Sequence, residues 1–312
     1  MARALARARV FIPRHMQSDT TAMDNAPDTS FGHHDNAGQI GFWNGDGGQR
    51  WVERQAALDG MLAPIDALLL ERAAIQPGER VLDIGCGCGA TTIAAAANVG
   101  ADGGVLGIDV SAAMLIRANE LAPEEAPVSF VQGDAMVHHF KAASCDLMIS
   151  RLGMMYFADA VRGLLNIRTA LRSGGRVAFA AWRDLRDNPW ALEPLQAVYD
   201  HVPKLPGLLP HAPDDFAFAQ QDWLEQVLSE AGLRRVRLER CDVALDIGGG
   251  QGLEGAALSA LAVGPASRAI NGQPPDAVAA ATTAVSKALA RYANGAAVTL
   301  PASVWIVTAV DP

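Results

Sequence analysis

The chain has 312 residues, of which 50% are hydrophobic, and a formal net charge of −9 at pH 7. Outside the extreme N-terminus no stretch is rich in lysine or arginine, which argues against nucleic-acid binding because phosphate contacts need clustered cations. No uninterrupted apolar stretch reaches membrane-spanning length, so no membrane span is expected.

Residues 1–40 are predicted to be a disordered or leader-like extension. The first 18 residues carry four arginines and no acid. This pattern is typical of a transit peptide or of an upstream start codon, with Met16 or Met23 as the alternative start. The rest of the extension is rich in Asp, Asn, Gly, Thr and His, which cannot build an apolar core.

Order is expected to begin near Phe42 and Trp43. A helical stretch is predicted from Trp51 to Leu69, where apolar residues recur at helical spacing, with a bend at Pro64. These helices are predicted to join the domain that follows.

The stretch from Val81 to Thr92 carries the strongest functional signal. An apolar run includes Asp83, glycines follow at alternate positions, and a run of small residues begins at once. This order predicts a strand, a tight turn and a helix N-terminus, where a nucleotide-like ligand lies against bare backbone. Gly85, Gly87 and Ala90 also satisfy the dinucleotide pattern G-x-G-x-x-G/A, so the loop alone leaves the ligand open.

Two further predicted strands end in acids. The strand over 104–109 ends in Asp109, a carboxylate suited to both ribose hydroxyls, and Ser111 is a predicted helix N-cap. The strand over 128–135 ends near Asp134, which is suited to accept from the exocyclic amine of adenine. Asp109 fits nicotinamide dinucleotides as well as other adenosyl ligands, so the third acid is the discriminating feature.

The remaining strands of the pattern follow in order. Residues 145–150 form a predicted fourth strand, and residues 151–156 follow it directly. Leu171 and Arg172 are predicted to end a helix in a glycine turn, before a fifth strand over 177–182. Alternating strands and helices predict an α/β fold with a largely parallel sheet.

Two segments outside this pattern are predicted to cover the ligand crevice. One is proline-rich, and the other is alanine-rich and mostly helical, notably over 276–292. The glycines between Ala244 and Gly252 repeat the first loop without a following acidic strand, so they are predicted to be a flexible joint. The expected organisation is 41–183 as ligand-binding core with N-terminal helices, 184–221 as a lid insertion, 222–247 as core, 248–300 as a helical insertion and 301–312 as the final core strand.

Five motifs in this order resemble those of class I S-adenosylmethionine-dependent methyltransferases: DIGCGCG, GIDVS, QGDA, CDLMIS and LRSGGRVAF. Within that superfamily the chain is similar to the UbiE-like small-molecule group. The resemblance is firm over residues 50–185, and residues 304–309 resemble the last strand of the fold. It implies a doubly wound, Rossmann-like sheet of seven strands, with the last strand antiparallel and helical lid insertions.

The resemblance also implies S-adenosylmethionine as cofactor and a set of residues that hold it. The glycines would let its methionine part approach the backbone, and Ser150 and Arg151 would lie beside the reactive methyl. The expected cofactor-binding residues are Asp83, Gly85, Cys86, Gly87, Gly89, Asp109, Val110, Met114, Gly133, Asp134, Ala135, Ser150 and Arg151. Weaker candidates to line the acceptor site are Trp43, Trp51, Met155, Tyr156, Trp190 and Tyr199.

The expected reaction is methyl transfer to an oxygen, nitrogen or carbon of a largely hydrophobic small molecule. An NAD(P)-dependent oxidoreductase and a non-catalytic S-adenosylmethionine-binding protein remain as alternatives. No catalytic residue is identified. His201 and His211 lie in the proline-rich segment and are candidates for a general base, although a solvated histidine is more usual in such a loop.

Neither a metal site nor a disulfide is expected. His138 and His139 are neighbours in an extended segment and therefore point to opposite faces. No histidine pair or second C-x-x-C at metal spacing accompanies the four cysteines, which are Cys86, Cys88, Cys145 and Cys241. Four cysteines without a disulfide pattern fit a reducing, cytoplasmic compartment.

Overall fold

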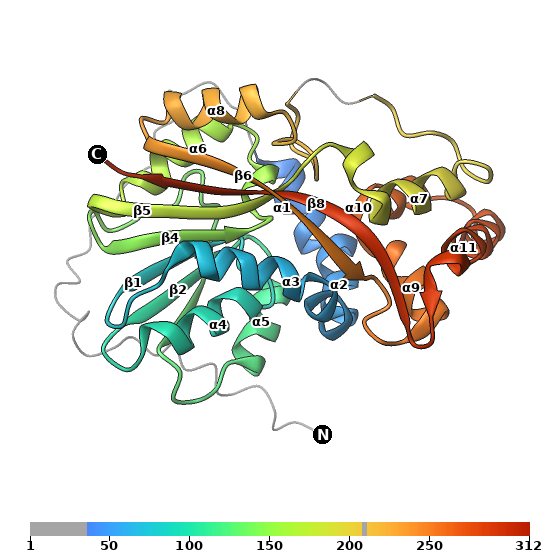
Figure 1. Ribbon diagram of the computed structural model, residues 1–312, viewed down its shortest axis with the longest axis horizontal. Coiled ribbons are helices and arrows are strands. Elements are labelled where there is room, and N and C mark those ends of the chain that lie inside the picture. Colours follow the sequence, from blue (N-terminus) through green and yellow to red (C-terminus); the bar gives the residue numbers. More distant parts are fainter. Residues whose placement is uncertain (1–35, 208–210) are drawn as a thin grey trace. The chain divides into compact units, whose positions relative to one another are not determined.

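The computed structural model describes residues 36–207 and 211–312. Residues 1–35 of the predicted extension, with the alternative start codons, lie outside the described residues. Within the described part, helices lie on both faces of one mostly parallel sheet (Figure 1). The expected α/β, doubly wound architecture is confirmed.

Seven strands form the main path of the sheet, in the order β3-β2-β1-β4-β5-β8-β6. Neighbours among β1 to β5 pair in parallel, and β8 pairs antiparallel with both β5 and β6. The predicted antiparallel last strand is thus confirmed, and a two-residue β7 adds a short pairing to β8. The strands are β1 Arg80–Ile84, β2 Gly104–Asp109, β3 Val128–Gln132, β4 Cys145–Arg151, β5 Leu171–Trp182, β6 Arg234–Asp246, β7 Ala293–Asn294 and β8 Ala297–Val310.

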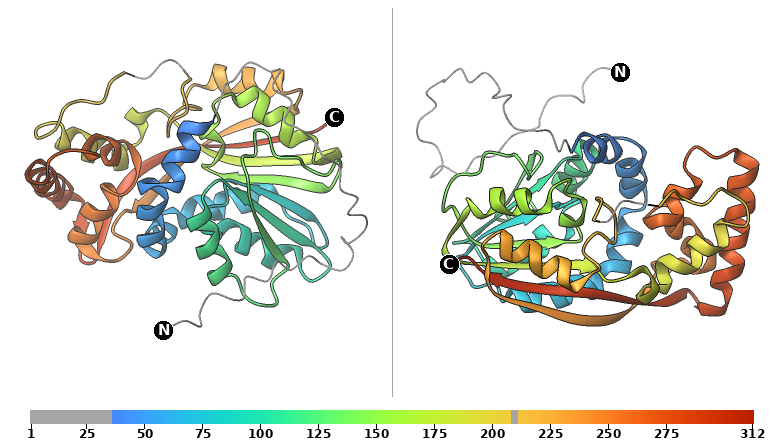
Figure 2. Two further views of the ribbon diagram at one scale, coloured as in Figure 1. Left: turned by 180° about the vertical axis from the view of Figure 1, so that it is seen from behind. Right: turned by 90° about the horizontal axis from the view of Figure 1, so that it is seen from above.

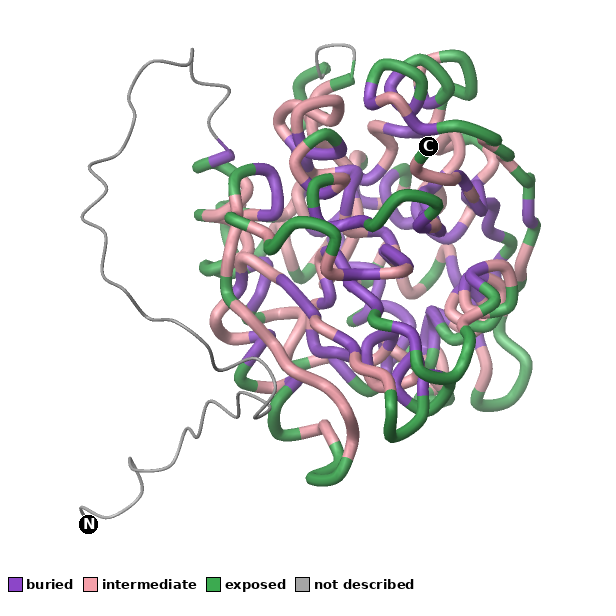
Figure 3. The backbone as a smooth tube through the Cα atoms, turned by 90° about the vertical axis from the view of Figure 1, so that its left-hand side faces the viewer, coloured by how far each residue is buried: buried purple, intermediate pink, exposed green. Residues whose placement is uncertain are grey.

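Alternation along the strands divides the core between the two faces of the sheet, because successive side chains of a strand point to opposite sides. Val81 and Leu147 pack with α3 (Gln55–Ala73) and α4 (Ala90–Val99). Leu82 and Met148, one residue along each strand, join the larger cluster on the other face. In Figure 3 the buried segments of the backbone tube (purple) run through the interior, and many exposed segments (green) lie at its edges.

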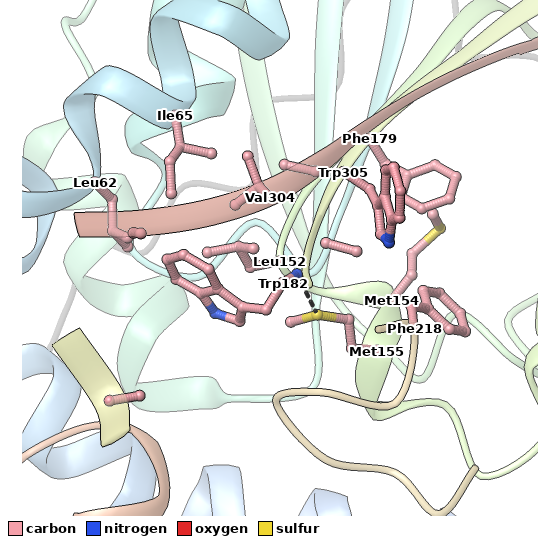
Figure 4. Close-up of a cluster of buried hydrophobic side chains, with 14 of the residues drawn as sticks. Leu62, Ile65, Leu152, Met154, Met155, Phe179, Trp182, Phe218, Val304 and Trp305 are labelled. Carbon is pink, nitrogen blue, oxygen red and sulfur yellow. Dashed lines mark hydrogen bonds between the residues drawn. The ribbon is translucent and has the colours of Figure 1, made fainter. Parts of the chain in front are cut away.

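The larger cluster extends over α6 (Ala160–Arg168) and α8 (Gln221–Glu230) and the inner face of β5 and β8. Figure 4 shows its centre, where Phe179, Trp182 and Trp305 meet Met154, Met155 and Phe218. The backbone N–H of Trp182 donates to the Met155 sulfur at 3.3 Å (Figure 4). This contact ties the end of β5 to the 3-10 turn Met154–Tyr156.

β6 and β8 run beyond the ends of the other strands, and helices from the later part of the chain gather beside this extension (Figure 1). Figure 2 shows the N-terminal helices (blue) between the sheet and these later helices (yellow to red). The site therefore has walls from three parts of the chain. The elements concerned are α1 Ala37–Asn44, α2 Asp46–Glu53, α7 Pro189–Val198, α9 Gly252–Ala260, α10 Gly264–Ile270 and α11 Pro275–Leu289. The fold is completed by α5 Ala112–Leu121 and 3-10 turns at Leu185–Asp187 and Ala290–Tyr292.

Two boundaries differ from the predictions. Helix α1 begins at Ala37, earlier than the expected start of order near Phe42, and the preceding Asn36 side chain donates to Asp134 Oδ1 at 3.3 Å. Leu171 does not end a helix: α6 ends at Arg168, and Leu171 already pairs with Cys145 of β4. Tight turns at Thr169 and Ala170, whose N–H groups donate three residues back, stop the helix.

The proline-rich segment after Asp184 also holds more regular structure than its sequence indicates. Helix α7 spans Pro189–Val198 and buries Trp190 and Leu195. Pro189 lies in the first turn, where its missing N–H is not needed. Pro194 lies on the buried side, so tertiary packing outweighs the local cost of a proline inside the helix.

Candidate functional site

A cavity opens at the carboxyl ends of β1, β2 and β4, bounded by α1, α2 and the turn before α10. Its walls enclose about 1340 Å³ of space, mouth included. Ligands of doubly wound sheets bind at this edge, where the strand order reverses.

The glycine loop after β1 presents bare backbone to this cavity. Gly85 and Gly87 have φ of +67° and +54°, a region that side-chain-bearing residues rarely adopt. A Cβ at Gly85 would lie 2.8 Å from the Cα of Gly153, so the loops after β1 and β4 approach each other only because both residues are glycines. A Cβ at Gly87 would have only the Met114 sulfur within 4 Å, at 3.6 Å, and would project into open space.

Asp109, at the end of β2, is fixed by two backbone groups. Its Oδ2 accepts from the Gly87 N–H and its Oδ1 from the Ser111 N–H, both at 2.8 Å. Burial raises the pKa of this carboxyl, and the two backbone donors offset part of the rise. Ser111 in turn caps α5, as predicted, by accepting from the Met114 N–H at 3.4 Å.

Asp134 reaches the cavity two residues after β3. Its Oδ1 accepts from the Met136 N–H at 3.0 Å and from the Asn36 side chain at 3.3 Å. Among the described residues no hydrogen bond reaches Oδ2, which remains able to accept from a ligand. Neighbouring Gly133 is required for packing, since a Cβ there would lie 2.9 Å from the His138 ring.

Helix α1 is anchored to the Asp109 loop. The Asn44 side chain donates to the Val110 carbonyl at 2.9 Å and accepts from the Ala112 N–H at 3.1 Å. Gly48 of α2 lies close to the Ser111 hydroxyl, 2.8 Å from an ideal Cβ. These contacts hold Trp43 and Trp51 at the cavity wall.

Arg151 lines the cavity between two carboxylates. It bonds to Asp66 at 2.5 Å and lies 3.6 Å from Asp59, both on α3. Asp66 also accepts from the Thr91 hydroxyl at 2.7 Å. The network joins β4, α3 and the start of α4, and it balances the charge of Arg151.

The part of the cavity beyond Arg151 is aromatic and apolar. Trp43 meets the rings of Trp51 and Tyr156 edge-on, with centroids 6.0 Å and 5.2 Å apart. Trp182 and Trp190 form a tilted pair at 4.6 Å. We call this region the aromatic chamber; its lining is Trp43, Trp51, Leu58, Met61, Leu62, Leu152, Tyr156, Phe157, Trp182, Trp190, Asp215, Ala262, Val263, Gly264, Ser267 and Arg268.

Known proteins resemble this chain in both sequence and fold. Residues 81–175 match the family described as a methyltransferase domain. A demethylmenaquinone methyltransferase of Beutenbergia cavernae is 32% identical over 180 residues, which are 54% of this chain and 70% of the relative. The chain belongs to the class I S-adenosylmethionine-dependent methyltransferases. The expected family and its UbiE-like character are confirmed, and the oxidoreductase alternative is set aside.

Two further relatives of this methyltransferase match over shorter stretches. Aklanonic acid methyltransferase DauC of Streptomyces is 38% identical over 120 residues, 38% of this chain and 54% of the relative. Nocamycin O-methyltransferase of Saccharothrix syringae is 33% identical over 146 residues, 45% of this chain and 51% of the relative. The chain thus spans about half the length of both relatives.

The fold has a counterpart among solved structures. The YcgJ protein of Bacillus subtilis superposes with a TM-score of 0.50 at 17% identity, covering 79% of this chain and 97% of the other. At this identity the likeness concerns the fold alone.

Most residues expected to bind the cofactor of this methyltransferase do line the cavity. They are Gly85, Cys86, Gly87, Asp109, Val110, Met114, Gly133, Asp134, Ala135 and Arg151. Of the expected acceptor-lining residues, Trp43, Trp51, Tyr156 and Trp190 do so as well.

Five expected residues do not line the cavity. Ser150 is buried and donates to the Ile84 carbonyl at 2.7 Å, so it joins β4 to β1 instead of facing a ligand. A Cβ at Gly89 would lie 3.0 Å from Ala118 and from the Phe130 ring, so this glycine serves helix packing. Met155 points into the core beside Trp182, and Tyr199 lies outside the cavity lining.

Asp83, the fifth, lies buried behind the glycine loop. Its Oδ2 accepts from the Thr92 hydroxyl at 2.6 Å, whereas its Oδ1 is buried without a hydrogen-bond partner among the described residues. Burial raises its pKa to about 7. An unpaired buried carboxylate oxygen is costly, and a cationic ligand group near the loop would lower that cost.

Sequence reasoning missed a polar cluster in the aromatic chamber. The Tyr156 hydroxyl donates to Asp215 Oδ1 at 2.5 Å. The Arg268 guanidinium donates to Asp215 Oδ2 and to Asp214 Oδ2, the latter at 2.8 Å. The adjacent acids of positions 214 and 215 are the only local signal, because Arg268 follows more than 50 residues later.

The other candidates lie away from this cluster. His211 stacks on Trp223 with ring centroids 3.9 Å apart, and His201 is exposed; neither lines the cavity. His138 packs against the Phe140 ring. All four cysteines are free and buried. Among the described residues no group of three or more His, Cys, Asp or Glu side chains is placed to hold a metal, and no helix combines the length and apolarity of a membrane span.

Proposed function

We propose that this protein transfers the methyl group of S-adenosylmethionine to an apolar small molecule. One observation carries the proposal: the bare glycine loop and the aromatic chamber line a single cavity. A cofactor on the loop and an acceptor in the chamber would then share one enclosed space.

The residues present fit the cofactor. The exposed backbone at Gly87 would admit its methionine part, and the unpaired Oδ1 of Asp83 suits its ammonium group. Asp109 would hold the ribose hydroxyls and Asp134 the adenine amine through its open oxygen. Backbone and side chains at Cys86, Val110, Met114, Gly133 and Ala135 would enclose the adenosine.

When bound, the cofactor supplies an activated sulfonium methyl, so the main task of the protein is to orient the two reactants. Holding reactants at near-attack geometry contributes on the order of 7–11 kcal/mol. The ordered wall of Trp43, Trp51, Trp182 and Trp190 would hold a flat apolar acceptor and exclude water. Arg151, neutralised by Asp59 and Asp66, would keep the boundary between the two subsites rigid.

Two insertions supply much of this wall, and we propose that residues 184–221 and 248–300 form an acceptor lid. Trp190 and Asp215 come from the first insertion, and Gly264 and Arg268 from the second. A cytoplasmic location is also part of the proposal, supported by the four free cysteines.

Calorimetric titration tests the proposal. The purified chain is titrated with S-adenosylmethionine, S-adenosylhomocysteine and NADH. We expect micromolar binding of the two adenosyl-sulfur ligands and none of NADH. Binding of NADH alone, or of none of the three, would refute the cofactor assignment. A non-catalytic role would be indicated if both sulfur ligands bind but no methyl transfer follows in a screen of lipophilic acceptors.

A further inference from the structure

The polar cluster Tyr156–Asp215–Arg268–Asp214 is unusual in its setting. It lies in a chamber whose other lining is nearly all aromatic or aliphatic. Its two carboxylates are almost fully buried, with 7% of the Asp215 and 12% of the Asp214 side chain exposed. Burying charges of this kind costs free energy even when they are paired, which favours a functional role for the cluster.

The hydrogen-bond directions determine what the cluster offers to a ligand. Tyr156 has one proton and donates it to Asp215, so its oxygen has only lone pairs left for a ligand in the chamber that this residue lines. Burial is the main cause, and the neighbouring Asp215 the next, that raises the pKa of the Tyr156 hydroxyl well above its usual value. The phenol therefore stays neutral. What faces the acceptor is a neutral hydrogen-bond acceptor in a fixed orientation.

The charges of the chamber exclude an anionic partner. Arg268 lies between Asp214 and Asp215, and Arg151 lies between Asp59 and Asp66. Each arginine of the cavity lining thus has two carboxylate neighbours, so neither guanidinium lacks a counter-charge. Among the described lining residues no unpaired cation is left to receive a carboxylate or phenolate of the acceptor.

A cationic partner is disfavoured for a chemical reason. An ammonium nitrogen has no lone pair with which to attack a methyl group, and it would lie in one cavity with the positive sulfonium of the cofactor. A neutral hydroxyl avoids both problems, since it can donate to the Tyr156 oxygen while keeping lone pairs for other contacts.

We propose that this cluster is a specificity site that selects acceptors carrying a neutral hydroxyl on a flat aromatic body, with the Tyr156 oxygen as the group that receives the hydroxyl hydrogen bond. Asp215 and Arg268 are positioning residues, because they act through Tyr156 by holding its proton away from the chamber. The inference rests on the proposed function and names the acceptor class for it.

Two naphthalenes of matched size test the charge selection: 2-naphthol and 2-naphthoate. Each is titrated calorimetrically at pH 7 into the protein saturated with S-adenosylhomocysteine. We expect 2-naphthol to bind at least about tenfold more tightly than 2-naphthoate. Equal or tighter binding of 2-naphthoate, or no binding of 2-naphthol up to millimolar concentration, would overturn the proposal.

Two variants separate the hydrogen bond from the charge. Tyr156→Phe should weaken 2-naphthol binding about five- to tenfold, the usual effect of one lost hydrogen bond, whereas the control Tyr199→Phe should have none. Asp215→Asn removes a negative charge and should raise 2-naphthoate affinity at least threefold, whereas Asp200→Asn should not. Unchanged affinities in both chamber variants would contradict the assignment, and thermal unfolding checks that each variant is folded.

The series also distinguishes this inference from the proposed function. If S-adenosylhomocysteine does not bind to the unaltered protein, the methyl-transfer proposal fails, and the naphthalene series is then run on the ligand-free protein. If S-adenosylhomocysteine binds and the naphthalene order is wrong, only the specificity site fails.

Discussion

Replacing Asp109 with alanine should weaken cofactor binding more than it destabilises the fold. The Gly87 and Ser111 N–H groups, which lie 2.8 Å from the Asp109 carboxylate oxygens, lose their acceptors, and this loss affects stability. The substitution also removes the proposed partner of the ribose hydroxyls, and this loss affects binding. Leaving the buried ribose hydroxyls without that partner costs about 1–3 kcal/mol of binding, a loss of about 5- to 150-fold in affinity.

The effect on stability is expected to be smaller because two contributions oppose each other. Burial already disfavours the charged form of Asp109, as the raised pKa indicates. Removing that charge offsets part of the lost hydrogen bonding, so we expect the free energy of unfolding to fall by less than about 2 kcal/mol.

The assay is calorimetric titration with S-adenosylhomocysteine at 25 °C, together with urea unfolding of the ligand-free protein. Asp102→Ala is the matched control, because Asp102 lies in the exposed turn before β2, at the opposite end of that strand. An affinity for S-adenosylhomocysteine within twofold of the unaltered protein in Asp109→Ala would refute the reasoning.

Three further predictions concern the same loop and its supports. Gly85→Ala should lower the unfolding free energy by about 1–3 kcal/mol more than the control Gly100→Ala. Both glycines have a positive φ, but only a Cβ at position 85 would contact Gly153. Equal losses of stability in urea unfolding would contradict this prediction. Ser150→Ala should cost about 1–3 kcal/mol of stability, and its affinity for S-adenosylhomocysteine should stay within threefold of that of the unaltered protein. A large loss of affinity without a loss of stability would instead support a contact between Ser150 and the cofactor. The pKa of Asp83 in the folded protein is about 7, above its usual value of 3.8, so the folded form retains its proton to higher pH and stability falls as pH rises from about 4 to 7. Asp83→Asn should therefore gain stability relative to the unaltered protein as pH rises from 5 to 8, and a pH-independent difference in melting temperature would refute this.

The sequence by itself determined the sheet, the glycine loop and the acids at the strand ends. These features depend on local rules: alternation makes a strand, glycines allow the left-handed turn at Gly85 and Gly87, and parallel strands end at one edge. Because that edge collects the carboxyl ends, Asp109 and Asp134 were predictable at the cavity without knowledge of any side-chain direction.

Tertiary structure decided which neighbours of those residues face the cavity. Arg151 lines it and Ser150 does not, because adjacent residues of β4 point to opposite sides. Tyr156 lines it and Met155 does not, because a 3-10 turn that no sequence pattern marks rotates the two apart.

The acceptor chamber was beyond the reach of local patterns for a different reason. Asp215 lies 59 residues after Tyr156, and Arg268 lies 53 residues after Asp215. No helical or strand period relates such positions. The packing of α7 against β8 and of α10 against α7 and α9 brings these distant segments together, and with them the polar groups proposed to select the acceptor.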